Sequence, residues 1–215
     1  VICQIGVSLV IAALLESKFM RRWQSVFYTI YFIPSLLMIT VTGITFKMLY
    51  SPTIGLLNPV LAKLGIDVSN IAILADAETA IWGVAAMSQW QFIGYTVVLF
   101  IVSMQSISDD IYEAAAIDGA TGIQRFFLIT APLMKNTIMI NMIIVITGAF
   151  RVYDEVYVMT GGGPGTSTQT LATYLYQIGF KNDQMGYASA IAFFVFIITF
   201  ILGLFQMKGY DLSDD

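Results

Sequence analysis

The side chains that most often perform chemistry are scarce in this sequence of 215 residues. It contains no histidine and a single cysteine, Cys3, so imidazole-based proton transfer, most zinc sites and an internal disulfide have no residues to build them. The glycine-rich run Gly161–Gly165 has no lysine at the spacing of a phosphate-binding loop. We therefore expect no catalytic residue, no metal site and no cofactor in this chain.

Acidic residues are most closely spaced over residues 109–118, within the polar stretch 105–136. Carboxylates beside a run of alanines suit the close approach of another protein's surface better than they suit catalysis. The charged residues of this stretch that we single out are Asp109, Asp110, Glu113, Asp118 and Arg125.

The same stretch carries signals for two short helices. Asp110 followed three residues later by Glu113 matches a capping box, and the three alanines after Glu113 are strong helix formers. Gly119 should end this first helix, and Pro132 should end a second one over residues 122–130. The sequence therefore predicts a helix–turn–helix hairpin.

A second polar cluster interrupts an apolar segment and contains Ser88, Gln89, Gln91, Phe92 and Tyr95. All of these except Gln89 share one helical face by the spacing of three, four and seven residues. Amides and aromatic rings could bind the hydroxyls and C–H faces of a sugar. They could equally form hydrogen bonds between helices, as polar residues in membranes commonly do.

Charges also occur near the end of a later apolar segment. Arg151 and Glu155 would lie one helical turn apart, which suits an ion pair at the outer membrane interface, with Asp154 beside it. The alternative is a cavity wall, with Gly148 and Val152 facing a sugar.

The elements that must position these residues follow from composition. The chain is 58% hydrophobic and 11% charged, against about 25% charged in a soluble domain. Such a low charged fraction predicts a polytopic transmembrane protein. Because no alternating strand pattern occurs, we expect its spans to be helices, which makes the fold an all-α transmembrane bundle. Residues 1–15 are short for a span and read as the tail of a truncated one. The four full spans are predicted over residues 27–49 (with a kink at Pro34), 80–104, 137–159 and 187–207.

Loop charges orient these spans. Cations are more frequent on the side predicted to be cytoplasmic, which includes the 16–26 loop, the 105–136 loop and the C-terminus; the cations there are Lys18, Arg21, Arg22, Arg125, Lys135 and Lys208. The other side has Lys63 and Lys181, with Lys47 near that interface. The formal charge of -4 offers no basic footprint for nucleic acid.

The hairpin region resembles the EAA loop of ABC importer permeases. That family pattern is EAA, three residues, G, nine residues, then I-x-L-P. The chain has EAA at 113–115, then Gly119, Ile129 and Pro132, and it departs from the pattern at Ala131, where the family usually has leucine.

The resemblance extends over essentially the whole chain and narrows to sugar permeases. GAFRVYDEVYVMTGGGP, TYLYQIGF and GYASAIAFF are similar to segments of the maltose and glycerol-phosphate importer permeases. This implies a single permease domain over residues 1–215, with the EAA coupling hairpin at 105–136 inside it. About five of six expected spans would be present.

The resemblance also implies partners and residue roles. A permease of this kind lies in the bacterial inner membrane as a multi-pass protein and pairs with a second permease, which makes a heterodimer. It works with two ATP-binding cassette subunits, which hydrolyse ATP, and with an extracytoplasmic solute-binding protein. The residues implied to couple to the ATPase are Glu113, Ala114, Ala115, Asp118, Gly119 and Arg125. Those proposed for the substrate pathway are Ser88, Gln89, Gln91, Phe92, Tyr95, Gly148 and Val152.

Other functions stay open at this stage. The same architecture could carry a glycerol phosphate, a polyol or an amino acid, although a phosphate would favour an intramembrane cation and Arg151 is the one candidate. An ion-coupled secondary transporter would need acids near the middle of the spans, where this sequence has none. The lack of histidine and of mid-span acid pairs also argues against a membrane-embedded enzyme.

Overall fold

The structure is a computed structural model that describes residues 1–17, 20, 23–67 and 71–211, with side chains through Gln206. Within these ranges the chain forms helices and connecting turns and no strand, which confirms the predicted all-α class. Three of the cations used for orientation, Lys18, Arg21 and Arg22, lie outside the described residues, as does the side chain of Lys208.

The chain divides into two compact units, which are described separately. The first unit comprises residues 1–36, 92–146 and 203–215, and the second comprises residues 37–91 and 147–202. The long helices α5 (Ala80–Gln105), α9 (Lys135–Ala149) and α12 (Met185–Asp211) each contribute residues to both units.

The first unit is built from short helices around the C-terminal half of α5. Its other elements are α1 (Ile2–Glu16), α2 (Gln24–Phe32), the 3₁₀ turn η1 (Ile33–Leu36), α6 (Asp109–Ile117), α7 (Gly122–Arg125), the π-helical turn η2 (Phe126–Thr130) and α8 (Ala131–Leu133). Its core residues come from α1, from α5 and from the residue between α8 and α9. They are Ala12, Leu15, Val97, Phe100, Ile101, Met104 and Met134.

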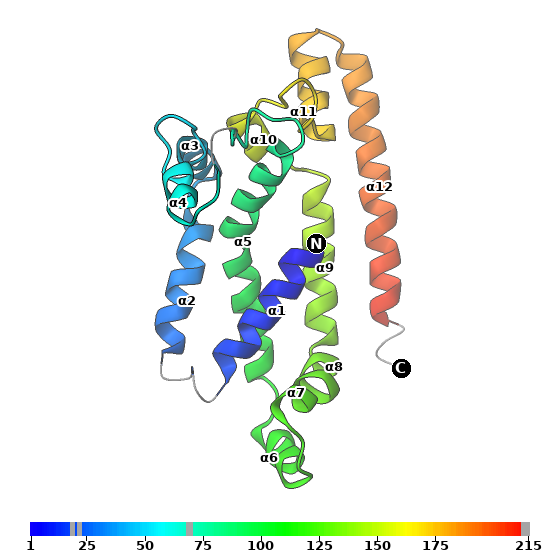
Figure 1. Cartoon of the computed structure of the whole chain (residues 1–215). Helices are drawn as coiled ribbons and strands as arrows, with labels where there is room; N and C mark the ends of the chain where they lie inside the picture. Colours follow the sequence, from blue (N-terminus) through cyan, green and yellow to red (C-terminus); the bar gives the residue numbers. More distant parts are fainter. Residues whose placement is uncertain (18–19, 21–22, 68–70, 212–215) are drawn as a thin grey trace. The chain divides into compact units, whose positions relative to one another are not determined.

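Polar side chains join the helices of the first unit. The Gln4 amide donates to the Thr96 hydroxyl at 3.1 Å, and the Ser8 hydroxyl donates to the Ile93 carbonyl at 3.2 Å, so α1 lies against α5 (Figure 1). At the other end of α1, the Glu16 carboxylate accepts from the amides of Gln24 at 2.6 Å and Gln105 at 2.9 Å. Such bonds hold helices together where the surrounding solvent is as apolar as the side chains.

The second unit packs a short helix across α3. Its elements, besides its shares of α5, α9 and α12, are α3 (Ile39–Leu49), α4 (Leu57–Lys63), α10 (Asp154–Met159), α11 (Leu171–Tyr176) and the π-helical turn η3 (Gln177–Lys181). Its core residues are Tyr50, Val84, Met87, Val156 and Met159. A Cβ on Gly43 would lie 2.9 Å from Cγ1 of Val158, so glycine lets α10 approach α3 closely.

The predicted spans are largely recovered. Helices α5 and α12 are each long and apolar enough to cross a bilayer, over residues 80–105 and 185–206. The first bent span consists of α2 with η1 and then α3, and it is interrupted at residues 37–38, just after Pro34 in η1. The helical segments 122–133 and 135–149 pass the same test only when they are taken together, and they are bent by 69° where they meet. Helix α1 is apolar but shorter.

The prediction of a continuous span over residues 137–159 is wrong. Helix α9 ends at Ala149, and α10 begins at Asp154. Two acids and an arginine within five residues are costly in hydrocarbon. The Thr170 hydroxyl donates to the Val152 carbonyl at 2.7 Å, so this carbonyl, which lies at the break in the helix, has a hydrogen-bond partner. Arg151 and Glu155 therefore do not share a helix, and the predicted pair one helical turn apart does not form.

Gly94 provides a test of the packing in the first unit. A Cβ at this position would overlap the carbonyl oxygen of Tyr31 in α2. We expect Gly94→Ala to destabilise the protein by roughly 1–3 kcal/mol, because the rigid backbone of α2 must move. Thermal unfolding of the purified protein would measure this. Gly6→Ala is the matched control, since the added methyl would meet open space on α1, and an equal loss in both variants would contradict the assignment.

Candidate functional site

The hairpin predicted over residues 105–136 is present, although its first cap differs from the prediction. Ser108, with extended backbone angles, is the N-cap of α6, and its hydroxyl accepts from the Asp110 amide at 3.3 Å. Asp110 is therefore not the cap but lies in the first turn beside Asp109, where carboxylates interact favourably with the helix dipole. Ser108 is the cap because its backbone is extended, as at most N-caps, and its hydroxyl therefore reaches a backbone amide of the first turn that has no partner within the helix.

The turn between the two arms is closed by backbone bonds. Gly119 has a φ of +77°, the left-handed conformation that favours glycine. The Gly119 amide donates to the Ala116 carbonyl at 3.2 Å, and the Ala120 amide donates to the Ala115 carbonyl at 2.9 Å. This is a Schellman motif, so Gly119 ends the first helix as predicted.

The second arm begins with a full capping box and continues as a π turn. Thr121 accepts from the Gln124 amide at 3.3 Å, and the Gln124 side chain accepts from the Thr121 amide at 2.8 Å. The π-helical turn η2 ends at Thr130 and is followed by α8, which contains Pro132. The prediction that Pro132 ends this second helix is therefore wrong, because proline is tolerated in the first turn of a helix. The hydroxyls of Tyr112 and Thr130, 3.0 Å apart, join the two arms.

The structure brings the predicted coupling residues together on this hairpin. Glu113, Ala114, Asp118 and Gly119 are exposed, Ala115 is buried between the arms, and Arg125 is half-buried with its Nε enclosed and unpartnered. The sequence reasoning missed an exposed apolar set on the same hairpin, which consists of Ile117, Ile123, Phe127 and Leu128. Ile117 is 87% exposed, and its position beside the glycine turn was the available signal.

A cavity of about 1050 Å³ separates the hairpin from the rest of the first unit. Its walls come from the C-terminal part of α1, the end of α5, α6 and the second arm, and its charged lining residues are Glu16, Asp109 and Arg125. Part of the hairpin surface therefore faces this cavity and is not packed against α1 or α5.

The mid-span polar cluster divides into buried and open members. Gln91 is 2% exposed, and its amide donates to the Leu37 carbonyl at 2.9 Å, at the interruption between η1 and α3. The side-chain oxygens of Gln91 and Gln89 are buried and unpartnered, and Ser88 is half-buried. In the first unit, Phe92 is half-buried and Tyr95 is 43% exposed. The bond of Gln91 fits the interhelical interpretation, and sugar binding by the cluster stays a prediction.

The remaining pathway candidates lie around the end of α9. Gly148 is exposed with open space where a Cβ would be, and Val152 packs beside the core of the second unit. Arg151 is exposed, whereas Glu155 is buried in α10. Burial raises the pKa of the Glu155 carboxyl above its usual range.

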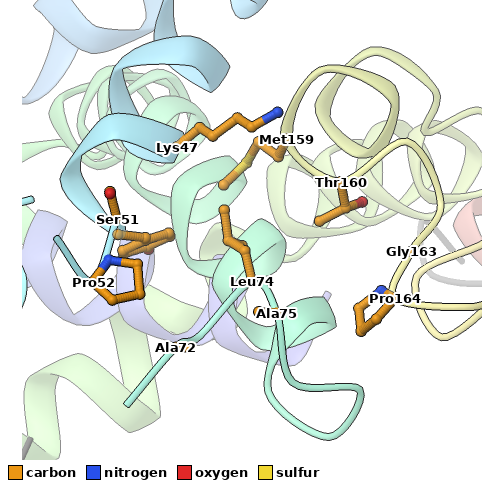
Figure 2. Close-up of a pocket in the computed structure, with 11 residues that line it drawn as sticks. Lys47, Ser51, Pro52, Ala72, Leu74, Ala75, Met159, Thr160, Gly163 and Pro164 are labelled. Atoms are coloured by element: carbon orange, nitrogen blue, oxygen red, sulfur yellow. The ribbon is translucent and has the colours of Figure 1, made fainter. Parts of the chain in front are cut away.

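A smaller cavity of about 410 Å³ opens in the second unit, between the end of α3, residues 72–75 and the glycine-rich loop. Figure 2 shows Pro52 and Pro164 on opposite sides of it, with Leu74 and Ala75 between them. Lys47 is the charged residue of its lining. In the loop, the Thr168 hydroxyl donates to the Gly163 carbonyl at 2.9 Å.

Comparison with known proteins agrees with this architecture. Residues 4–207 match the family described as "Binding-protein-dependent transport system inner membrane component". The chain is 46% identical over 210 residues to the probable ABC transporter permease protein YurN of Bacillus subtilis (strain 168), covering 98% of the chain and 72% of YurN.

Two further relatives are named for sugar transport. The arabinooligosaccharides transport system permease protein AraP of Bacillus subtilis (strain 168) is 32% identical, and the match covers 95% of the chain and 65% of AraP. The multiple sugar-binding transport system permease protein MsmF of Streptococcus mutans is 31% identical, with 97% and 70% covered. The chain thus spans about two thirds of the length of these two relatives.

A solved structure shows the same fold. A chain of the bacterial alginate ABC transporter, in complex with an alginate pentasaccharide-bound periplasmic protein, superposes with a TM-score of 0.85 at 21% identity. The match covers 94% of this chain and 70% of that one.

The two glycines of the hairpin give a paired test. Gly119→Ala should destabilise the hairpin by about 1 kcal/mol, because alanine is strained in the left-handed conformation, and amides of α6 should exchange hydrogen faster. Gly122→Ala, at the start of α7 with no positive φ and open space around it, should leave exchange unchanged or slow it. Faster exchange in the Gly122 variant alone would contradict this account of the turn.

Proposed function

The chain belongs to the family of binding-protein-dependent transport system inner membrane components, and on that premise we propose that it is one permease subunit of an ATP-driven importer. Its spans would form part of the translocation pathway for a sugar or related carbohydrate. It would lie in the bacterial cell membrane as a multi-pass protein and pair with a second permease. Two ATP-binding cassette subunits would hydrolyse ATP, and an extracytoplasmic binding protein would deliver the solute.

The observation that carries the proposal is the hairpin of residues 108–133. It presents an exposed glutamate, exposed small residues and exposed apolar side chains, including Ile117, Ile123 and Leu128, on one short, locally closed element. An exposed apolar patch rimmed by charge is typical of a protein interaction site. Docking of an ATPase subunit here would cover Ile117, Ile123 and Leu128, which otherwise remain in solvent.

The carbohydrate assignment is supported by the relatives and by the character of the polar cluster. AraP and MsmF are named for arabino-oligosaccharide and multiple-sugar transport. Tyr95 offers an exposed ring in the middle of α5.

Delivery by a binding protein fits the second unit. The glycine-rich loop and the cavity beside Lys47 lie on the side that the loop charges predict to be extracytoplasmic. The superposed permease was solved together with a loaded periplasmic protein. A cavity with the Lys47 ammonium in its described lining suits an acidic or polar side chain of such a partner.

Coupling would run from the hairpin into α5. Helix α5 ends at Gln105 and α6 begins at Asp109, so a short connection transmits displacement of the hairpin to the span. Alternating access by rigid-body movement needs such a mechanical link between motor and pathway.

Reversing the charge of Glu113 tests the coupling. In the reconstituted complex, Glu113→Lys should lose about 2 kcal/mol or more of docking free energy. Sugar uptake should fall while membrane insertion stays normal.

Gly119→Arg should uncouple uptake from ATP hydrolysis in the same way. Glu78→Lys, at another exposed glutamate outside the hairpin, is the matched control, and normal transport in the Gly119→Arg variant would contradict the docking assignment.

The energy source separates this proposal from an ion-coupled transporter. Uptake of labelled sugar by proteoliposomes containing the complex and its binding protein should require ATP and persist after an ionophore collapses the ion gradients. Loss of uptake on adding the ionophore at constant ATP would favour the secondary transporter instead.

A further inference from the structure

A stack of aromatic rings joins α10, α11 and η3 in the second unit, and the proposed coupling does not use it. Tyr153 and Tyr157 are stacked, with ring centroids 5.2 Å apart and 15° between the planes. Tyr176 stands edge-on to both rings, at 5.4 and 5.5 Å. Phe180 stacks on Tyr176 at 5.4 Å and 27°. Four rings from three segments thus form one continuous assembly.

Neighbouring contacts hold this assembly in place. The Thr170 hydroxyl, which caps α11, donates to the Val152 carbonyl next to Tyr153. Beneath Phe180, Gly179 lets η3 lie directly on α12, because a Cβ there would be 2.9 Å from Cβ of Ala188. The rings are therefore positioned before any ligand arrives, which lowers the entropy lost on binding.

The outer end of the stack is open. Phe180 is 66% exposed although Tyr176 covers it on one side, and Tyr157 is 41% exposed. Polar groups surround these rings: the Lys181 ammonium lies 5.9 Å from the Tyr157 ring centroid, and the Gln177 side chain is exposed and accepts from Gln169 at 2.7 Å.

This combination differs from an aromatic surface made for lipid. Helix α12 also carries a stack, formed by Phe193, Phe196 and Phe200, but the residues around it in the sequence are alanine, valine, isoleucine and threonine. The turn that carries Phe180 instead has two polar side chains: the exposed amide of Gln177, and Lys181, whose ammonium lies 5.9 Å from the Tyr157 ring centroid. A pyranose ring has the matching chemistry, with an apolar C–H face and hydroxyls around its edge.

We propose that the exposed ring of Phe180, backed by Tyr176 and carried on the same turn as the polar side chains of Gln177 and Lys181, is a carbohydrate-binding subsite. It receives a saccharide ring on the extracytoplasmic side, before the solute enters the spans. The inference rests on the proposed function, because the loop charges and the sugar importer assignment place this surface where substrate arrives.

Binding to the assembled transporter tests the subsite directly. The complex in nanodiscs, without its binding protein, would be titrated with maltotriose and with arabinotriose by saturation-transfer NMR. Phe180→Ala should weaken binding about threefold to tenfold, as expected for loss of one ring contact, and Phe180→Trp should retain it. Phe193→Ala is the matched control, because Phe193 is 63% exposed and also stacked, and it should bind as the wild type does.

The outcomes separate the subsite from the function on which it rests. Equal binding by the wild type and Phe180→Ala, or quenching of the tryptophan introduced at position 180 by brominated lipid and not by iodide, would overturn the subsite. So would a wild-type complex that imports a saccharide with its binding protein but binds neither probe alone. A complex that imports no saccharide would refute the proposed function itself.

Discussion

The need to satisfy every backbone polar group inside an apolar solvent governs this structure. Helices meet that need by themselves, so each place where a helix stops requires a side chain or a turn to take over the freed groups. The Gln91 amide does so at the carbonyl of Leu37, and the Thr170 hydroxyl does so at the carbonyl of Val152. Both interruptions are therefore built features, and residues that we propose for the substrate pathway lie close to each of them.

In the hairpin, which is predicted to lie outside the spans, the backbone groups at the helix ends are also hydrogen-bonded locally. Its two arms use a serine cap, a Schellman turn and a complete capping box, so their ends need no help from the rest of the chain. This local closure leaves the apolar side chains of Ile117, Ile123 and Leu128 free to face a partner. The caps and the turn thus stabilise the hairpin without using these apolar side chains.

Much of this could be predicted from the sequence where one signal dominated. Long apolar runs predicted α5 and α12. Gly119 predicted the turn after α6, because glycine is the residue type that most readily adopts the left-handed conformation found there. Predictions were wrong where two local signals competed: Ser108 and Asp110 could both cap α6, and the apolar character of residues 137–159 hid the break after Ala149. The contact between Gln91 and Leu37 joins residues far apart in the chain, so sequence periodicity could not reveal it.

The closure of the hairpin also bears on how the protein is made. The bonds that define it link residues between Ser108 and Thr130, so they require nothing from α9 or α12, which are synthesised later. The hairpin can therefore reach its final shape, on the side predicted to be cytoplasmic, while the ribosome is still translating the last spans. An interaction surface for a soluble subunit would then exist before membrane insertion of the permease is complete.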